Sequence, residues 1–586
     1  MSRAALVFPP QWDPRQPPLG LAVLAGSLRA AGADVRVFDL NLALYQRLLT
    51  PAVPGGIEEI LKHRLLDPAG LADPPAYLRT SEELQRIFDS RLDPDGLSRL
   101  FWDTAGGPWS PASARDWQAV LTGRETPPAV RHLAPEITSL LDWNPDLIGL
   151  SVIADTQLGA ALALAGRLRR ARPGVRLVIG GDALTYRRSL LPALPWLREW
   201  VDVIGLGDGE PLLEALATLP AAPTVCPVSS TTGPGASGPA LAVLATNPGP
   251  PSSSQPSPRP VPPGPLPNGL AWGADGAPAM GPTVLPDLGR LPPPAFDALP
   301  LADYLTPHLV MPLETARGCP WGRCAFCIHP VRAPTGRPLY RPTPLDVVAA
   351  HVRSLFEAGH RRFFVVDEAV PPPRLRALAD LFAALPGPVS WIAYTRLDAG
   401  HDRAGFDRAR ASGCRKLFIG VETGSDRLLA RFHKGVDAAR SRRVLLDAAA
   451  AGLAVHFFLM TGFPGEEAAD RQATIDLLAD VWPAFDPFGI SYDLFLLSGE
   501  RDTDLLADPT AFGWEGPTPC PHQELAWQFP VAAGPAAAAA WSDFRRRLDD
   551  LADRVCGPAW GLRHAALAQD SLHLLLLEAH SSPPAG

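Results

Sequence analysis

The sequence predicts an α/β protein with two sheets of parallel strands. Short apolar runs alternate with stretches of helical period five times within residues 1–219, and the alternation returns six times within residues 285–500. A stretch rich in Pro, Gly and Ser, residues 220–284, separates the two series. Strands that alternate with helices pair in parallel, because each helix returns the chain to the starting edge of the sheet. At 586 residues the chain is long enough for two or three domains.

The first series predicts a doubly wound, Rossmann-like domain over residues 1–219. Its expected strands are Ala4–Phe8, Asp34–Phe38, Asp146–Val152, Arg176–Ile179 and Val201–Leu206. Its expected helices are Gly20–Ala31, Thr156–Arg170, Leu184–Trp200 and Glu210–Leu219. Residues 42–140 lack the alternation, so we interpret them as an insertion with helices at Ile57–Leu65, Thr80–Leu92 and Ser113–Leu121.

Sheets of this type bind ligands at the carboxyl ends of their strands. The candidate binding residues at those ends are Ser151, Gly180, Gly181, Gly207 and Glu210. A glycine lets a ligand approach the backbone closely. A glycine after a strand is equally suited to an ordinary turn, and both interpretations stay open.

The second series predicts a partial (β/α)6 barrel over residues 285–500, followed by a small cap, residues 501–586. A closed barrel of this kind has about eight strands, so six steps leave it open. The expected strands are Leu309–Glu314, Arg362–Val366, Val389–Tyr394, Lys416–Val421, Ala454–Met460 and Gly489–Leu497. The expected helices are Pro344–Glu357, Leu375–Ala384, Ala404–Ala411, Ser441–Ala451 and Ala468–Trp482. The composition of residues 220–284 cannot bury enough apolar surface to offset ordering, so we expect a linker there.

Three of the seven cysteines lie directly after the first barrel strand. Cys319, Cys324 and Cys327 have the spacing C-x4-C-x2-C. Without a secretory signal, cysteines this dense indicate metal ligands rather than disulfides. Zinc sites and ordinary ferredoxin clusters usually take four protein ligands, whereas three suit a [4Fe–4S] cluster with one open iron. A zinc knuckle completed by His329 is the alternative.

The stretch Arg317-Gly-Cys-Pro-Trp-Gly-Arg-Cys-Ala-Phe-Cys327 resembles the cluster loop of radical S-adenosylmethionine (SAM) enzymes. It is one residue longer than the usual C-x3-C-x2-C of that superfamily. The resemblance implies that Cys319, Cys324 and Cys327 hold the cluster as metal ligands and catalytic residues. It also implies that one electron from the cluster splits SAM into methionine and a 5′-deoxyadenosyl radical.

The same resemblance implies a SAM-binding set at the barrel's strand ends. Asp367 and Glu368 correspond to the segment that receives the methionine amino group, and Arg396 supplies a guanidinium of the kind that meets a carboxylate. Glu422 and Ser425, in Gly-Val-Glu-Thr-Gly-Ser, match a motif near SAM, and Gly462, in Phe-Leu-Met-Thr-Gly-Phe-Pro-Gly-Glu, matches the loop near the adenine. The alternatives are a helix N-cap for the acidic pair, an ordinary ion pair for the arginine and a turn for the glycine.

Four segments of residues 1–219 resemble the cobalamin-binding domain that precedes many radical SAM domains. They are residues 17–25, 146–151, 178–181 and 207–211. The resemblance implies a cobalamin site at the strand ends named above. The loop from Pro10 to Gly20 lacks the histidine of the Asp-x-His-x-x-Gly motif that ligates cobalt. Either cobalamin binds without a protein histidine or the domain has lost the cofactor, and we expect binding.

Charge and hydropathy narrow the class of partner. Acidic residues outnumber basic ones, 61 against 53, and the net charge of -8 argues against a general nucleic-acid-binding surface. No apolar run approaches the roughly 18 residues that span a membrane, so we expect a cytoplasmic protein with no membrane partner. The expected partners are a small-molecule or peptide substrate and a reductase, flavodoxin or ferredoxin that donates electrons.

These observations predict a radical SAM enzyme that methylates an unactivated carbon with the help of cobalamin. A cobalamin-independent radical SAM enzyme and a non-catalytic metal-binding protein are the alternatives.

Overall fold

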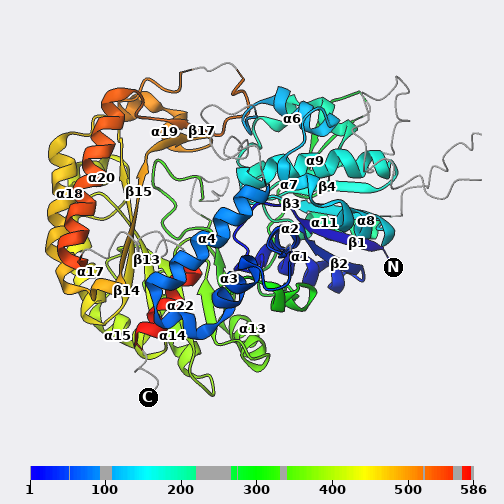
Figure 1. Cartoon of the computed structure of the whole chain (residues 1–586). Helices are drawn as coiled ribbons and strands as arrows, with labels where there is room; N and C mark the ends of the chain where they lie inside the picture. Colours follow the sequence, from blue (N-terminus) through cyan, green and yellow to red (C-terminus); the bar gives the residue numbers. More distant parts are fainter. Residues whose placement is uncertain are drawn as a thin grey trace, which may run out of the picture. The chain divides into compact units, whose positions relative to one another are not determined.

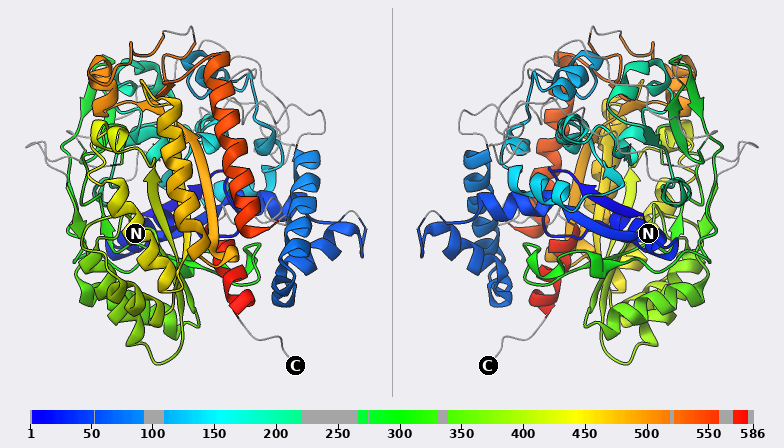
Figure 2. Two further views of the ribbon diagram at one scale, coloured as in Figure 1. Left: turned by 90° about the vertical axis from the view of Figure 1, so that its left-hand side faces the viewer. Right: turned by 90° about the vertical axis from the view of Figure 1, so that its right-hand side faces the viewer.

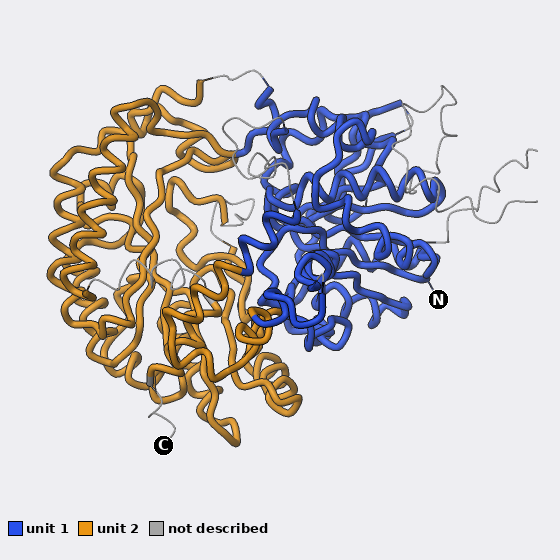
Figure 3. Tube along the Cα trace, viewed as in Figure 1, with its two compact units in different colours: residues 1–60, 84–304, 519–527 blue, residues 61–83, 305–518, 528–586 orange. Residues whose placement is uncertain are grey.

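The computed structural model describes residues 2–51, 53–92, 109–219, 266–273, 275–329, 339–518, 522–557 and 570–581. The chain divides into two compact units (Figure 3). Unit 1 comprises residues 1–60, 84–304 and 519–527, and unit 2 comprises residues 61–83, 305–518 and 528–586. Each unit contains one large sheet. Each is also composed of segments that are far apart in the sequence.

Unit 1 is built on a seven-stranded sheet with the order β2-β1-β3-β4-β5-β6-β7. Its first five strands pair in parallel, which confirms the five predicted strands. They are β1 (Arg3–Phe8), β2 (Asp34–Asp39), β3 (Leu147–Ser151), β4 (Arg176–Gly180) and β5 (Val203–Gly205). The order 2-1-3-4-5 is that of flavodoxin-like folds, in which the strand order reverses between β1 and β3 and ligands bind at that point.

The last two strands of this sheet were not predicted. β6 (Gly269–Trp272) pairs with β5 and β7 (Pro278–Met280) pairs with β6, both antiparallel. Both lie within the stretch expected to be a linker. Residues 220–265 and 274 of that stretch lie outside the described residues.

The helices of unit 1 follow the expected alternation except at one place. α1 (Leu19–Ala30), α9 (Asp155–Ala171) and α11 (Glu210–Thr218) confirm three predicted helices. The helix expected over Leu184–Trp200 is wrong. It is replaced by three short pieces: α10 (Asp182–Thr185), η2 (Leu191–Ala193) and η3 (Pro195–Glu199). Prolines 192 and 195 carry no backbone N–H and therefore interrupt a helix at this point.

The insertion is helical, as expected. Its described elements are α2 (Leu40–Leu48), α3 (Ile57–Leu66), η1 (Pro68–Ala72), α4 (Pro74–Leu92), α6 (Ala114–Thr122), α7 (Pro128–Arg131) and α8 (Ala134–Asp142). In the core of unit 1, Leu21 and Leu28 of α1 pack with Leu6 and Phe8 of β1 and with Leu212 of α11.

Unit 2 is built on a six-stranded sheet with the order β15-β14-β13-β12-β11-β8. Figure 1 labels β15, β14 and β13 of this sheet. Every neighbouring pair is parallel, and β8 and β15 form the two edges, so the predicted partial (β/α)6 barrel is confirmed. The strands are β8 (Met311–Leu313), β11 (Arg362–Val365), β12 (Ser390–Thr395), β13 (Cys414–Glu422), β14 (Ala454–Thr461) and β15 (Ile490–Leu496).

Helices connect these strands and cover one face of the sheet. They are α13 (Leu345–Glu357), α14 (Pro372–Ala383), α15 (Arg403–Ala411), α16 (Asp426–Arg431), α17 (Ala438–Ala450) and α18 (Ala468–Val481). The long α20 (Pro535–Cys556) lies alongside α18 next to β15 (Figure 2). Further elements of unit 2 are β9 (Ala316–Arg317), β10 (Arg341–Pro342), η6 (Trp482–Ala484), η7 (Pro487–Gly489), β16 (Ser498–Glu500), α19 (Asp504–Ala507), η8 (Pro509–Phe512), β17 (Gln528–Pro530) and α22 (Asp570–Ser581). None of the described helices is both long and apolar enough to cross a membrane.

Candidate active site

The cysteine loop begins two residues after the two-residue strand that follows β8. That strand, β9, pairs with β10 in antiparallel fashion, which fixes the start of the loop. All three cysteines are free thiols, and Cys324 is buried. Burial and then the neighbouring Cys324 raise the pKa of Cys327 to about 12. A cationic iron at each sulfur would reverse that shift, because metal binding deprotonates a thiol.

An iron–sulfur cluster and a single metal ion place different demands on their ligands. Each cysteine of an iron–sulfur cluster binds a different iron, so the sulfurs need not converge on one point. Within the described ranges, no three His, Cys, Asp or Glu side chains are arranged so that they could hold a single metal ion. The three free thiols of the loop are the donor type that the expected cluster takes.

Asp367 follows β11 and binds the segment that leads into the cysteine loop. One of its carboxylate oxygens accepts hydrogen bonds from the backbone N–H groups of Thr315 (2.6 Å) and Ala316 (3.0 Å), and the other accepts one from the Thr315 hydroxyl at 2.5 Å. Burial raises the pKa of Asp367 to about 6, although these hydrogen bonds lower it. In this structure its contacts go to the loop's backbone. Glu368 beside it is exposed.

Arg396 follows β12 and reaches the cysteine loop directly. Its Nη1 lies 3.6 Å from Cys324 Sγ, its Nη2 donates to the Lys434 carbonyl at 2.6 Å, and only 6% of its surface is exposed. Burial lowers the pKa of Arg396, but the negative charges of Cys324 and Asp398 outweigh it and the net shift is upward. The structure thus brings this predicted site residue into contact with Cys324 of the cysteine loop. Its nearest carboxylate is Asp398, with Nε 3.4 Å from Oδ1.

Glu422 at the end of β13 pairs with Lys434, which sequence reasoning missed. The Lys434 Nζ lies 2.5 Å from Glu422 Oε1, and both residues are buried, at 5% and 7% exposed. The carbonyl of the same lysine accepts the Arg396 hydrogen bond. In the sequence, Lys434 cannot be distinguished from an ordinary solvated lysine. No local signal could therefore have predicted this pair.

Ser425 and Gly462 have structural contacts of their own. The Ser425 hydroxyl caps α16 by accepting from the Leu428 N–H, and it donates to Asp470 Oδ1 at 2.6 Å. Gly462 has a φ of +83°, and its N–H donates to Glu466 Oε2 at 2.7 Å. Their contacts with SAM stay a prediction, as do those of Glu368, Asp367 and Glu422.

Glu500 is a second residue of the site that the sequence did not reveal. Burial raises its pKa to about 7, while the backbone N–H of Ile328 hydrogen-bonds to it and lowers the pKa. The same carboxyl contributes to the raised pKa of Cys327. A titratable carboxyl therefore lies beside the last cysteine of the loop.

The strand ends of unit 1 form tight backbone contacts. Gly181 has a φ of +114°, and a Cβ added there would lie 2.3 Å from the Val152 carbonyl oxygen. Gly180 faces Gly205 across the β4–β5 pair. The Gly207 N–H donates to the Thr185 hydroxyl at 3.0 Å, Glu210 is buried at the start of α11, and Ser151 ends β3 half-buried.

The loop after β1 carries Gln11 in the region where the cobalt-ligating histidine is absent. Its carbonyl accepts from the Thr156 hydroxyl at 3.0 Å, and the Gln157 side chain donates to the Pro9 carbonyl at 2.7 Å. Gln11 is 8% exposed, and its Nε2 has no hydrogen-bond partner among the described residues. An orphaned buried donor at the reversal point of the sheet fits a site that a polar ligand completes.

Comparison with known proteins relates both parts of the chain to known folds. The family model described as the radical SAM superfamily matches residues 313–478. Those residues are a radical SAM domain. The match runs from β8 through α18 and includes the cysteine loop, Arg396, Lys434 and Glu422.

Two solved structures share the fold over nearly the whole chain. The cobalamin-dependent radical SAM enzyme OxsB aligns over 94% of this chain and 67% of its own, with a TM-score of 0.58 and 14% identity. The radical SAM methyltransferase TsrM from Kitasatospora setae aligns over 94% of this chain and 89% of its own, with a TM-score of 0.53 and 14% identity. The likeness shows the fold: a domain built on a doubly wound parallel sheet together with a partial (β/α)6 barrel.

Curated relatives match a part of the chain. The tRNA-2-methylthio-N(6)-dimethylallyladenosine synthase of Chloroflexus aurantiacus is 26% identical over 271 residues, which cover 44% of this chain and 51% of that protein. The ribosomal protein uS12 methylthiotransferase RimO of Desulfosudis oleivorans is 32% identical over 219 residues, covering 34% and 47%. The chain spans about half the length of these relatives.

Proposed function

We propose that Cys319, Cys324 and Cys327 hold a [4Fe–4S] cluster and that the chain uses it to cleave SAM. The bound cluster would supply one electron to a sulfur–carbon bond of SAM, leaving methionine and a 5′-deoxyadenosyl radical. The observation that carries the proposal is the position of the three free thiols. They follow the edge strand β8 of a matched radical SAM domain, and the Arg396 guanidinium lies 3.6 Å from the Cys324 sulfur.

The chain's own residues prepare this site. Asp367 holds the start of the loop through the backbone of Thr315 and Ala316. Arg374 adds to that hold, since its Nη2 donates to the carbonyls of Thr315 and Thr343, each at 2.7 Å. Arg396 places a positive charge beside a cysteine sulfur in a buried environment, where charge–charge interactions are strong. SAM would bind at the same strand ends, with Glu368 the exposed acidic group for its ammonium.

We further propose that unit 1 binds cobalamin at the carboxyl ends of β1, β3 and β4. The support is the 2-1-3-4-5 strand order, the close backbone at Gly180 and Gly181, and the orphaned Gln11 amide. Cobalamin would carry a methyl group, and the substrate radical would be methylated at an unactivated carbon. The substrate is a small molecule or peptide, and a flavodoxin, ferredoxin or reductase supplies the electron.

Methylthio transfer is the second candidate, because the curated relatives named above are methylthio-transferring enzymes. That reaction needs a sulfur source in addition to SAM. Residues 1–225 contain no cysteine, so the β1–β5 part of unit 1 offers no thiolate for a second, sulfur-supplying cluster. Methyl transfer is therefore favoured.

The test uses the full chain, purified and reconstituted without oxygen. Mass spectrometry of the reduced protein with SAM should detect 5′-deoxyadenosine, and the Cys319→Ala, Cys324→Ala and Cys327→Ala variants should form none. Cys414→Ala is the matched control, since Cys414 is fully buried in β13 and should leave cleavage intact. Cleavage retained in a loop variant would overturn the cluster assignment.

The cobalamin proposal has its own measurement. The reconstituted chain should retain cobalamin through gel filtration, visible in its absorption spectrum. SAM labelled in its methyl group should then pass the label to product carbon. Cobalamin lost on the column, with SAM cleavage intact, would leave a cobalamin-independent radical SAM enzyme. Label recovered on sulfur in the product, or in added tRNA, would favour methylthio transfer.

A further inference from the structure

Three consecutive backbone carbonyls accept hydrogen bonds from the cysteine loop and from Arg396. The Phe432 carbonyl accepts from the Ala325 N–H at 3.0 Å, the His433 carbonyl from Trp321 Nε1 at 2.8 Å, and the Lys434 carbonyl from Arg396 Nη2 at 2.6 Å. We name residues 432–435 the clamp segment. The Lys434–Glu422 ion pair anchors it to the end of β13. Segments more than 100 residues apart in sequence are thereby tied together at the loop.

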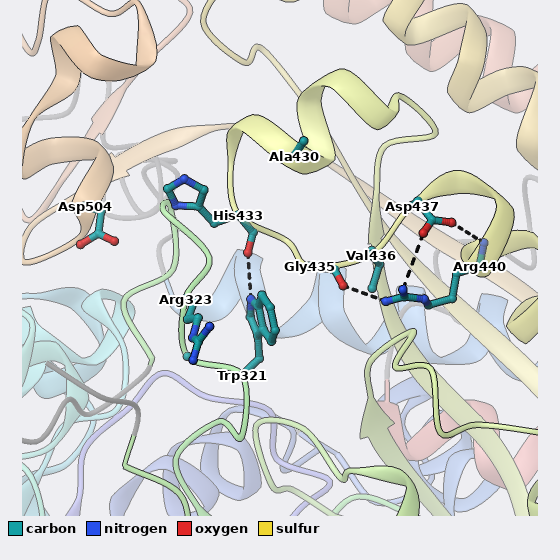
Figure 4. Close-up of a pocket in the computed structure, with 10 residues that line it drawn as sticks. Trp321, Arg323, Ala430, His433, Gly435, Val436, Asp437, Arg440 and Asp504 are labelled. Atoms are coloured by element: carbon teal, nitrogen blue, oxygen red, sulfur yellow. Dashed lines mark hydrogen bonds and ion pairs between the residues drawn. The ribbon is translucent and has the colours of Figure 1, made fainter.

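The Trp321 indole lies against the last residue of the clamp segment. A Cβ added to Gly435 would lie 2.2 Å from Trp321 Cζ2 and 2.4 Å from Cη2, so only glycine leaves room for the ring. Gly435 also has a φ of +76°. Trp321, His433 and Gly435 line a pocket of about 620 Å³, and Figure 4 shows the indole pointing from the cysteine loop toward the His433 carbonyl.

The same indole contacts the cation that touches the cluster ligand. The Arg396 guanidinium carbon lies 5.3 Å from the centre of the Trp321 ring, within the range of a cation–π contact. Arg396 thus contacts the indole, the Lys434 carbonyl and the Cys324 sulfur, and its Nε lies 3.4 Å from Asp398 Oδ1. Loss of the indole would remove one of these four contacts and let the guanidinium move away from the sulfur.

We infer that Trp321, seated on Gly435, is a positioning residue that holds Arg396 against Cys324 and so raises the reduction potential of the cluster. This inference rests on the proposed function. One electron enters the cluster from the external donor, and no bond forms or breaks in that step. A hydrogen bond and a positive charge at a cysteine sulfur favour the more negative, reduced state. Removing them shifts the midpoint potential to more negative values.

The test compares two glycine-to-alanine variants of the full, reconstituted chain. Gly435→Ala introduces a methyl group that would overlap with the Trp321 indole ring, 2.2 Å from Cζ2. Gly359→Ala is the matched control, because Gly359 also has a positive φ, +97°, but has nothing within 4 Å of an added Cβ. Both variants carry the backbone strain, and only the first displaces the ring. We expect a more negative midpoint potential and faster cluster loss in air for Gly435→Ala, and wild-type values for Gly359→Ala.

Substitutions of the tryptophan complete the design. Trp321→Ala should shift the midpoint potential in the same direction, and Trp321→Phe, which keeps a ring beside Arg396, should recover most of it. Once Trp321 is Ala, adding Gly435→Ala should cause no further shift, since no ring remains to clash. Thermal unfolding of each apoprotein separates loss of fold from loss of position.

Each outcome of these measurements has a single interpretation. Variants that keep iron and fold but retain the wild-type potential would overturn the inference while the proposed function stands. Additive shifts in the double variant would overturn it too. A wild-type chain that takes up no [4Fe–4S] cluster, judged by iron content and electron paramagnetic resonance after reduction, would instead refute the proposed function.

Discussion

Lys434 Nζ lies 2.5 Å from Glu422 Oε1, and neither side chain has more than a tenth of its surface exposed. Burial removes most of the hydration of both charges, so each depends on the other. The pair lies at the end of β13, and the Lys434 carbonyl holds Arg396 beside Cys324. A buried ion pair therefore supports the geometry of the cysteine loop.

Removing the lysine charge should destabilise the fold strongly. Lys434→Met leaves the Glu422 carboxylate buried without its partner, a change that costs about 3–5 kcal/mol. The free energy of unfolding, from denaturant titration of the apoprotein, measures the loss. Arg403→Met is the control, because Arg403 forms an exposed pair with Asp407 and should cost at most about 1 kcal/mol. Equal losses in the two variants would contradict the dependence on burial.

Asp367 gives unit 2 a dependence on pH with a defined sign. Burial raises its pKa in the folded chain from 3.8 to about 6. The folded state therefore binds a proton more readily than the unfolded state, and stability falls as pH rises from about 4 to about 6 and is constant above that range. The shift corresponds to about 3 kcal/mol in total.

Asp367→Asn removes this titration. The difference in unfolding free energy, wild type minus variant, should grow by about 2 kcal/mol in favour of the wild type as pH falls from 7 to 4.5. Denaturant titrations of the two apoproteins at several pH values measure it. A difference that stays constant across the range would show that Asp367 titrates near its ordinary value.

Gly181 should not tolerate a side chain. Its φ of +114° disfavours other residues, and an added Cβ would lie 2.3 Å from the Val152 carbonyl oxygen. Gly181→Ala should cost about 1–3 kcal/mol in the stability of unit 1 and weaken cobalamin retention. Gly174→Ala serves as control, since nothing lies within 4 Å of its Cβ position. Equal stability and retention in both variants would refute the tight contact.

Arg187 ties residues 522–527 to the rest of unit 1. Its guanidinium makes two hydrogen bonds with Asp155, at 2.7 and 2.8 Å, and one with the Leu525 carbonyl at 3.0 Å, and it is 1% exposed. Trp527 Nε1 donates to the same aspartate at 3.0 Å. Arg187→Met should release this segment and increase its cleavage in limited proteolysis at least several-fold.

Arg188→Met, a neighbouring substitution of the same type, is the comparison for this experiment. The cleavage sites are read by mass spectrometry. If both variants resist protease as the wild type does, the Arg187 contacts do not hold the segment in solution.

The order of strands and helices followed from the sequence because the signals are local. Alternating apolar runs predicted all five parallel strands of unit 1 and all six of unit 2. The exceptions have local causes as well: prolines 192 and 195 break a stretch of helical period, and β6 and β7 are short strands beyond a segment poor in apolar residues. The C-x4-C-x2-C spacing of the three cysteines is a local signal of the same kind, since all three lie within nine residues.

The alternation of strands and helices, the positions of the strand ends and the three cysteines could thus be predicted from local sequence patterns. Which side chains meet at the strand ends depends on the fold. Asp367 is 52 residues from Thr315, Arg396 is 72 from Cys324 and Trp321 is 112 from His433. Partners at such separations leave no periodic trace in the chain. Parallel strands bring their carboxyl ends to one edge of the sheet. Charged residues buried at that edge form hydrogen bonds and ion pairs with one another and with the cysteine loop.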